Sequence, residues 1–183
     1  MSSAGDRERA APLRLGLISD THGLLRPEAV QALSGAVELL HAGDVGKPAV
    51  LAGLEQLAPV HAVRGNVDRW PGAEGLPTRL DLTRAGVRIR IVHDRAEVGD
   101  DRDVDVVVYG HSHRPRVETV GDVLYVNPGS AGPRRFSLPV SVATLVLGDG
   151  PPRAELVELV VAPARRRVKK TGAPPPARPR PSG

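Results

Sequence analysis

Short apolar runs that each lead to a polar residue are the feature of this sequence that most restricts its fold. Runs rich in Val, Leu and Ile are typical of buried strands. The runs and the polar residues that follow them are 13–19 with Asp20 and His22, 37–41 with Asp44, 59–63 with Asn66, 87–92 with His93, and 104–109 with His111 and His113. The pattern therefore predicts five strands whose carboxyl ends carry chemically active side chains.

The spacing of the remaining elements predicts an α/β domain. Pro27 and Pro48 open two predicted helices, over 27–34 and 48–57, because proline suits the first turn of a helix. A further strand over 123–126 leads into a turn at 127–130, and 140–147 and 154–161 are predicted as closing strands. Strands alternate with helices in the first half and follow one another in the second, which favours a mostly parallel sheet with an added antiparallel part.

Composition limits the classes of site that the chain can build. Cysteine is absent from all 183 residues, which excludes disulfides, thiolate nucleophiles and zinc sites of the cysteine type. Aromatic residues make up only 2%, so the core is expected to consist of Val, Leu, Ile and Ala, and an aromatic platform for nucleic acid is disfavoured. No apolar run approaches the ~20 residues of a membrane span, and the first twelve residues lack the apolar core of a signal peptide. A cytoplasmic location without membrane contact is expected.

Positive charge is concentrated at the end of the sequence. Residues 163–183 carry seven Lys and Arg residues and no acid, so the net charge of +4 falls to −3 for residues 1–162. The expected organisation is a leader over 1–12, one domain over 13–162 and a disordered tail rich in Pro and Arg over 163–183. Such a tail is more often solvated than a nucleic-acid arm, although nucleic-acid binding through it stays open.

The five strand ends together predict a metal site. Sites in open α/β sheets form beyond the carboxyl ends of strands, where segments distant in sequence meet. Oxygen and imidazole ligands without thiolate suit manganese, iron, zinc or nickel. Two close divalent ions also need a carboxylate between them.

Each of these residues has a simpler explanation when taken alone. Asp20 can cap a helix or turn, Asn66 can occupy a left-handed turn after glycine, and His111 with His113 can mark a surface strand end. Their occurrence in one order along the chain favours the metal site. His41 and His61 fall outside the set and are expected to be core or strand residues.

The same residues resemble a known family. Asp20-x-His22, Gly43-Asp44, Gly65-Asn66-x-Asp68, His93 and Gly110-His111-Ser112-His113 are similar to the signature of calcineurin-like metallophosphoesterases. The small bacterial and archaeal phosphodiesterase branch also shares His41-Ala42-Gly43-Asp44 and Asn127-Pro128-Gly129-Ser130. The resemblance spans about 13–147 and implies an αββα sandwich of four layers with mixed sheets.

The resemblance also implies a ligand set and a reaction. One ion would take Asp20, His22 and His113, the other Asn66, His93 and His111, and Asp44 would bridge them. Manganese is the first expectation for both ions, with iron, zinc or nickel as alternatives. A hydroxide between the ions would attack the phosphorus of a small phosphoester in line, with Asp44, Asn66 and His111 as the principal catalytic residues.

Three departures from that family's pattern bear on leaving-group chemistry and substrate. Val67 stands where the superfamily has a histidine often assigned as general acid, and Asp94-Arg95 replace the usual Gly-His after His93. The stretch from His93 to His111 is also short, which predicts a trimmed helix. If a protein side chain donates the leaving-group proton, His41 and His61 are the remaining histidines to consider.

Some neighbouring residues and two other functions stay open. Asp68 can orient a ligand or cap a turn, Arg95 can bind phosphate or lie in solvent, and Asn127 with Ser130 can shape a turn or meet substrate. A non-catalytic scaffold, as in the small phosphoesterase-like subunit of retromer, and a nuclease that uses the tail are the other functions. Self-association is also left open.

Overall fold

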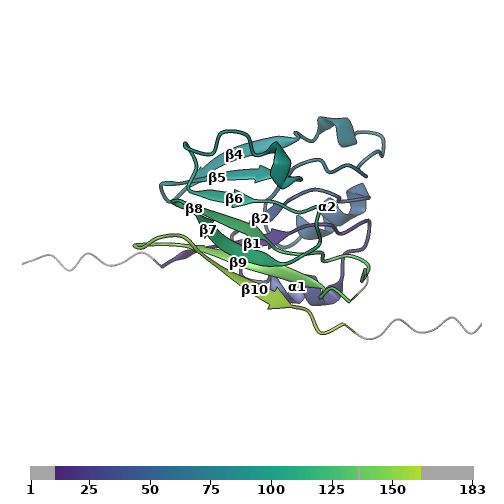
Figure 1. Cartoon of the computed structure of the whole chain (residues 1–183). Coiled ribbons are helices and arrows are strands. Elements are labelled where there is room, and N and C mark those ends of the chain that lie inside the picture. The colour runs from purple at the N-terminus through teal and green to yellow at the C-terminus, as the bar shows by residue number, and fades with distance from the viewer. Residues whose placement is uncertain (1–10, 136, 162–183) are drawn as a thin grey trace, which may run out of the picture.

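Two five-stranded sheets stacked face to face form the body of the molecule (Figure 1), in a computed structural model that describes residues 11–135 and 137–161. The first sheet has the strand order β10-β9-β1-β2-β3. Its strands are β1 (Leu13–Ile18), β2 (Glu38–His41), β3 (Val60–Ala62), β9 (Ser141–Leu147) and β10 (Arg153–Glu158). β1, β2 and β3 are parallel, whereas β9 pairs antiparallel with both β1 and β10.

The second sheet also has three parallel strands, but they lie at its centre instead of at one side. Its order is β4-β5-β6-β8-β7, and β5, β6 and β8 are parallel while β4 and β7 run antiparallel at the two edges. The strands are β4 (Arg79–Arg84), β5 (Val87–Val92), β6 (Val106–Val108), β7 (Arg116–Val120) and β8 (Val123–Asn127). The predicted α/β class with mixed sheets is therefore confirmed.

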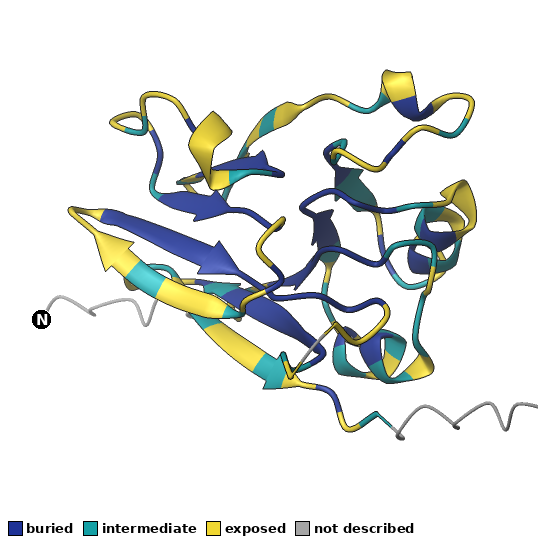
Figure 2. Ribbon diagram, turned by 45° about the vertical axis from the view of Figure 1, so that its right-hand side comes forward, coloured by how far each residue is buried: buried dark blue, intermediate teal, exposed yellow. Residues whose placement is uncertain are grey.

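Aliphatic side chains fill the space between the sheets. Leu17, Leu40 and Leu145 of the first sheet belong to the same cluster as Ile91 and Val108 of the second, and all five are fully buried. Figure 2 shows these inner strands in dark blue. The core is aliphatic, as the composition predicts, because strands buried on both faces need apolar residues at almost every position.

The two outer faces of the sandwich are covered unequally. Helices α1 (Pro27–Ala32) and α2 (Pro48–Leu54), which both begin at proline as predicted, pack Leu33 and Leu54 onto the first sheet. The outer face of the second sheet is covered by the segment between His93 and Asp105, which contains only the short 3-10 helix η2 (Arg95–Glu97). A second 3-10 helix, η1, spans Ala73–Gly75. The fourth layer is thus thin, in agreement with the predicted trimming of a helix there.

The predicted element limits hold to within a few residues, with two omissions. Both helices end earlier than predicted, at Ala32 and Leu54. β4 and β7 were not predicted, because both are edge strands whose polar residues interrupt any apolar run. The predicted tail, and the leader apart from residues 11 and 12, fall outside the described residues. Among the described helices, none is long and apolar enough to cross a membrane.

Candidate metal centre

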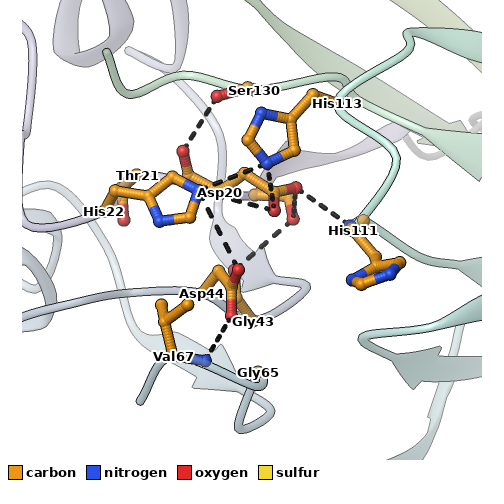
Figure 3. A network of polar contacts seen from close by, with 12 residues as sticks. Asp20, Thr21, His22, Gly43, Asp44, Gly65, Val67, His111, His113 and Ser130 are labelled. Carbon is orange, nitrogen blue, oxygen red and sulfur yellow. Dashed lines mark hydrogen bonds and ion pairs between the residues drawn. The ribbon is translucent and has the colours of Figure 1, made fainter. Parts of the chain in front are cut away.

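All seven predicted ligands meet at one end of the sandwich. The parallel strands of both sheets direct their carboxyl ends to this region, so that loops from five strands converge there. Figure 3 shows Asp20, His22, Asp44, His111 and His113 surrounding a common space. This is the arrangement expected of a site at the carboxyl edge of a parallel sheet.

The first group consists of Asp20, His22 and His113. Asp20 Oδ1 lies 3.2 Å from His113 Nε2 and 4.0 Å from His22 Nε2. The two imidazole Nε2 atoms are 3.2 Å apart. One oxygen and two nitrogens therefore face one another across a space of atomic size, and all three can act as ligands of a single ion.

The second group consists of Asn66, His93 and His111, with Asp44 between the groups. Asn66 Oδ1 lies 3.0 Å from His93 Nε2 and 3.3 Å from His111 Nδ1. Asp44 directs Oδ1 toward His93 Nε2, at 3.3 Å, and Oδ2 toward His22 Nε2, at 3.9 Å. Its two oxygens thus face different groups, which is the position that a bridging carboxylate requires. Asp20 also lies close enough to Asp44 and His93 for these three residues to hold one metal ion together.

The backbone at the site is held in an uncommon conformation. Five candidate ligands have positive φ: Asp20 at 54°, His22 at 47°, Asp44 at 54°, His111 at 65° and His113 at 57°. Ala85 is the only other described residue of this kind besides glycine. Non-glycine residues pay a conformational cost in this region, and such strain concentrates at functional sites. The strain lets each loop turn sharply after its strand and direct its side chain inward.

Close packing of the loops explains one glycine of the motifs. A Cβ on Gly65 would lie 2.2 Å from both the backbone nitrogen and Oδ1 of Asp44. Only glycine therefore lets the β3 loop approach the Asp44 loop this closely. The same approach lets the Val67 amide donate a hydrogen bond to Asp44 Oδ1, at 3.0 Å.

Burial and hydrogen bonding set the charges in the site. Burial alone would raise the pKa of Asp44, but hydrogen bonds from His93 and from the Val67 amide lower it below its usual value. Burial lowers the pKa of His22. For His93, burial is outweighed by the hydrogen bond to Asp44 and by the Ala42 carbonyl, which raise its pKa to about 9.

The donor set fits divalent cations. Asp20 is fully buried, and its Oδ1 has no hydrogen-bond partner although it faces two imidazole nitrogens. An unpaired buried carboxylate oxygen is costly, so an oxygen left open in this position fits a ligand of a divalent cation. His93 Nδ1 donates to the Ala42 carbonyl, at 2.8 Å, which leaves Nε2 for a ligand bond.

Serine hydroxyls hold Asp20 in place. Ser19 Oγ donates to Asp20 Oδ2 at 2.7 Å, and the His111 amide donates to the same oxygen at 3.1 Å. Ser130 Oγ donates to the Asp20 carbonyl at 2.9 Å. Ser19 was missed from the sequence, because it adjoins the motif in a run read only as a strand.

Asp68, Asn127 and His41 also support the loops. Asp68 accepts from the Gly46 amide at 2.7 Å and from the Gly65 amide at 2.8 Å, so it joins the Asp44 loop to the Asn66 loop. Asn127 donates to the Gly110 carbonyl beside His111, at 2.8 Å. His41 is fully buried and contacts Thr21 Oγ1 at 3.0 Å. Because the Thr21 hydroxyl donates to the Val45 carbonyl, His41 Nε2 carries the hydrogen of that contact.

His61 and Arg95 lie in other contacts. His61 Nε2 lies 2.8 Å from Glu38 Oε2, and Arg84 binds the same carboxylate. Arg95 pairs with Glu118 at 2.5 Å and stacks over Tyr125, 4.8 Å from the ring centre. Arg95 is exposed, at 42% of its side chain, and its guanidinium group is shared between solvent, an acid and an aromatic ring, so it is not a free phosphate ligand.

Three cavities have His111 in their lining, and two of them also touch a second candidate ligand. The larger, of about 400 Å³, lies next to Asn66 and His93 and is also lined by Arg64, Arg69 and Asp94. The smaller, of about 180 Å³, lies next to His113 and is also lined by Arg135 and Leu138. The ligand set is thus accessible from two directions.

Comparison with known proteins identifies the family. The model of the calcineurin-like phosphoesterase superfamily domain matches residues 13–150, which includes all seven candidate ligands. The chain belongs to this superfamily. A probable metallophosphoesterase of Methanothermobacter thermautotrophicus is 37% identical over 149 residues, which cover 74% of this chain and 87% of that protein.

Solved structures agree with the family in fold. The structure described as a novel archaeal phosphodiesterase has a TM-score of 0.64 at 23% identity, covering 79% of this chain and all of that one. Vps29 from Entamoeba histolytica complexed with zinc has a TM-score of 0.61 at 24% identity, covering 80% and 99%. Members with this fold therefore include both a phosphodiesterase and a vacuolar sorting protein, so the fold alone does not decide the function.

Proposed function

We propose that this metallophosphoesterase is a phosphodiesterase that holds two divalent ions. The observation that supports it most is the placement of Asp44 between two groups of donors, with one carboxylate oxygen facing each group. Asp20, His22 and His113 would hold one ion, and Asn66, His93 and His111 the other. Manganese is our first expectation for both positions.

The bound ions would polarise the phosphoryl oxygens and lower the pKa of a water molecule. The protein would supply position and charge. Asp44 keeps its negative charge over a wide pH range because its pKa is lowered, so it can offset the repulsion between two cations. Asn66 contributes a neutral oxygen, which leaves the open side of the site less negative and more accessible to an anionic substrate.

The two cavities favour a diester over a monoester. A phosphodiester carries two organic groups on phosphorus, and cavities of about 400 and 180 Å³ meet at His111 from different sides. Each can accept one of these groups while the phosphorus lies at the ligand set. The similar fold of the archaeal phosphodiesterase supports the same choice.

The direct test uses metal-free protein supplied with manganese, iron, zinc or nickel in turn. Bis-p-nitrophenyl phosphate and p-nitrophenyl phosphate share one leaving group and differ in the second organic group. We expect metal-dependent hydrolysis with a higher kcat/KM for the diester. Faster hydrolysis of the monoester would reject the diester assignment, and equal rates with and without metal would reject the metal assignment.

A non-catalytic scaffold is the second candidate, favoured by the Vps29 structures among the neighbours. Metal binding does not distinguish the two functions, because one of those Vps29 structures holds zinc. Turnover does distinguish them. A fully metal-loaded protein that hydrolyses none of the esters in the panel would favour the scaffold.

A further inference from the structure

The larger cavity has a cationic wall beside the candidate second metal position. Arg64 precedes Asn66 by two residues and Arg69 follows it by three, and both line the same cavity as Asn66 and His93. The loop that carries them is fixed, because the buried Asp68 carboxylate binds the amides of Gly46 and Gly65. The loop thus places both arginines in the cavity that Asn66 and His93 line.

These arginines differ from the seven described arginines that form ion pairs. Seven arginines each pair with a carboxylate: Arg79, Arg84, Arg88, Arg90, Arg95, Arg102 and Arg116. For Arg64 and Arg69, the described residues provide no carboxylate partner and no guanidinium hydrogen bond. Arg64 is moreover half-buried. Arg69 is exposed and adds a second guanidinium group beside it. A partly buried guanidinium group without a partner is costly, so Arg64, with Arg69 next to it, is suited to bind an anion from outside the protein.

Acidic side chains in the same cavity favour the arginines as the place where an anion binds. Asp94 and Glu97 also line this cavity. Asp94 Oδ1 accepts from the Ala96 amide at 3.0 Å, and Oδ2 lies 3.8 Å from His111 Nε2, so its charge faces His111. An anionic group in the cavity is therefore repelled by these carboxylates and attracted to the arginines, whose planar guanidinium groups can bind it with two hydrogen bonds.

We propose that Arg64 and Arg69 form an anion subsite for a second anionic group on one arm of the phosphodiester substrate. The proposal rests on the proposed function, since the first phosphoryl group has to lie at the ligand set. It narrows the substrate class to diesters that carry an additional phosphate or carboxylate on the group that enters the larger cavity.

The test compares probes that differ only in the second anion. Propylphosphonate has one anionic group, propane-1,3-bisphosphonate has two phosphonates, and 4-phosphonobutanoate has a phosphonate and a carboxylate. Calorimetric titration of the manganese-loaded protein at fixed free manganese gives their dissociation constants without any need for turnover. We expect at least one of the two probes with a second anionic group to bind about tenfold or more tightly than propylphosphonate, as a charge-assisted contact permits.

Substitution of the two arginines tests whether they cause the tighter binding of probes with a second anionic group. Replacing both arginines, by Arg64→Gln and Arg69→Gln, is expected to abolish most of the preference while leaving propylphosphonate affinity nearly unchanged. Arg14→Gln is the matched control, because Arg14 is an exposed arginine at the opposite end of β1 that also has no carboxylate partner among the described residues. The preference is the dissociation constant of propylphosphonate divided by that of a probe with two anionic groups. A wild-type ratio near one, or a ratio that is unchanged in the double variant, would overturn the subsite. If the wild type does not hydrolyse bis-p-nitrophenyl phosphate, the proposed function is rejected. The calorimetry still decides whether the subsite exists.

Discussion

The two halves of the candidate centre differ in exposure. Asp20 is fully buried, and the side chains of His22 and His113 are only 11% and 10% exposed. On the other side the His93 side chain is also buried, at 4% exposed, but the His111 side chain is 49% exposed and Asn66 is open to solvent. The buried half is surrounded by hydroxyls and amides that fix its side chains, whereas the more open half faces the larger cavity. We therefore expect the buried half to set metal affinity and the more open half to set substrate choice.

The largest expected effect is that of Asp44→Asn, which acts on both halves at once. The amide can still accept the hydrogen bond from the Val67 amide, so the loops stay in place, but the negative charge between the cations is lost. We expect both ions to bind more weakly, with a loss of turnover beyond the ~10–100-fold typical of residues that only orient a ligand. The measured metal content should fall below the wild-type value of about two manganese ions per chain.

A matched control for that change is Asp94→Asn, which removes a carboxylate beside His111 without touching the space between the two groups. Its effect on metal content should be small. A single tightly bound ion in the wild type, unaffected by Asp44→Asn, would contradict the bridged arrangement.

Ser19→Ala tests the buried half alone. It removes the hydroxyl that donates to Asp20 Oδ2, so Asp20 loses an orienting contact. We expect roughly 10–100-fold weaker metal binding, measured by competition with a chromogenic chelator. Ser112→Ala, which affects contacts near the open half, should change this affinity much less. Equal effects of the two changes would remove the distinction between the halves.

Val67→His tests the open half. Valine has no proton to donate, so the rate should depend steeply on leaving-group pKa in a series of aryl esters, and histidine should make that slope shallower. General acid catalysis contributes roughly 10²–10⁴-fold at most, and the largest gain is expected for poor leaving groups. Val67 is 40% exposed, which leaves room for the larger ring.

A shallow slope in the wild type would show that another donor already acts. The structure leaves His41 and His61 in unsuitable positions for that role. His41 is fully buried against Thr21, and His61 is paired with Glu38. A bound water or the substrate itself would then be the donor to test.

The free energy of unfolding of the protein should depend on pH through His41. Burial lowers the pKa of His41 from 6.5 to about 4. As the pH falls below the pKa of His41 in the unfolded chain, the unfolded chain binds a proton there and the folded protein does not. The free energy of unfolding therefore decreases until the pH reaches the pKa of His41 in the folded protein. Between about pH 7 and about pH 5 this group should cost about 2 kcal/mol. Urea unfolding of the metal-free protein should show a flatter pH dependence in His41→Gln than in the wild type.

The smallest expected effect is that of removing residues 163–183, which lie outside the described residues. Hydrolysis of small diesters should be unchanged, because the segment has no pattern that could form core. If the tail binds nucleic acid, its removal should abolish a weak binding that depends strongly on salt. A large loss of turnover with small diesters would place the tail in the fold or the site.

Local patterns in the sequence were sufficient for the central strands and for the candidate ligands. Buried strands such as β1 and β5 need continuous apolar runs, and their carboxyl ends meet wherever the strands are parallel, so Asp20 and His93 were identified from position alone. β4 was recoverable in principle, since Leu80 and Leu82 alternate with polar residues. β7 lacks such a signal, because it is an edge strand that forms through pairing with β8.

The sequence by itself determined which side chains are available at the strand ends, since that follows from order along the chain. Only the tertiary structure decided how they divide into a buried and an open half, because exposure depends on which segments pack above each loop. It likewise decided that Arg95 is occupied by Glu118 while Arg64 and Arg69 line a cavity with no carboxylate partner among the described residues. Ion pairs of this kind join residues far apart in sequence, and no local pattern records which acid an arginine will meet.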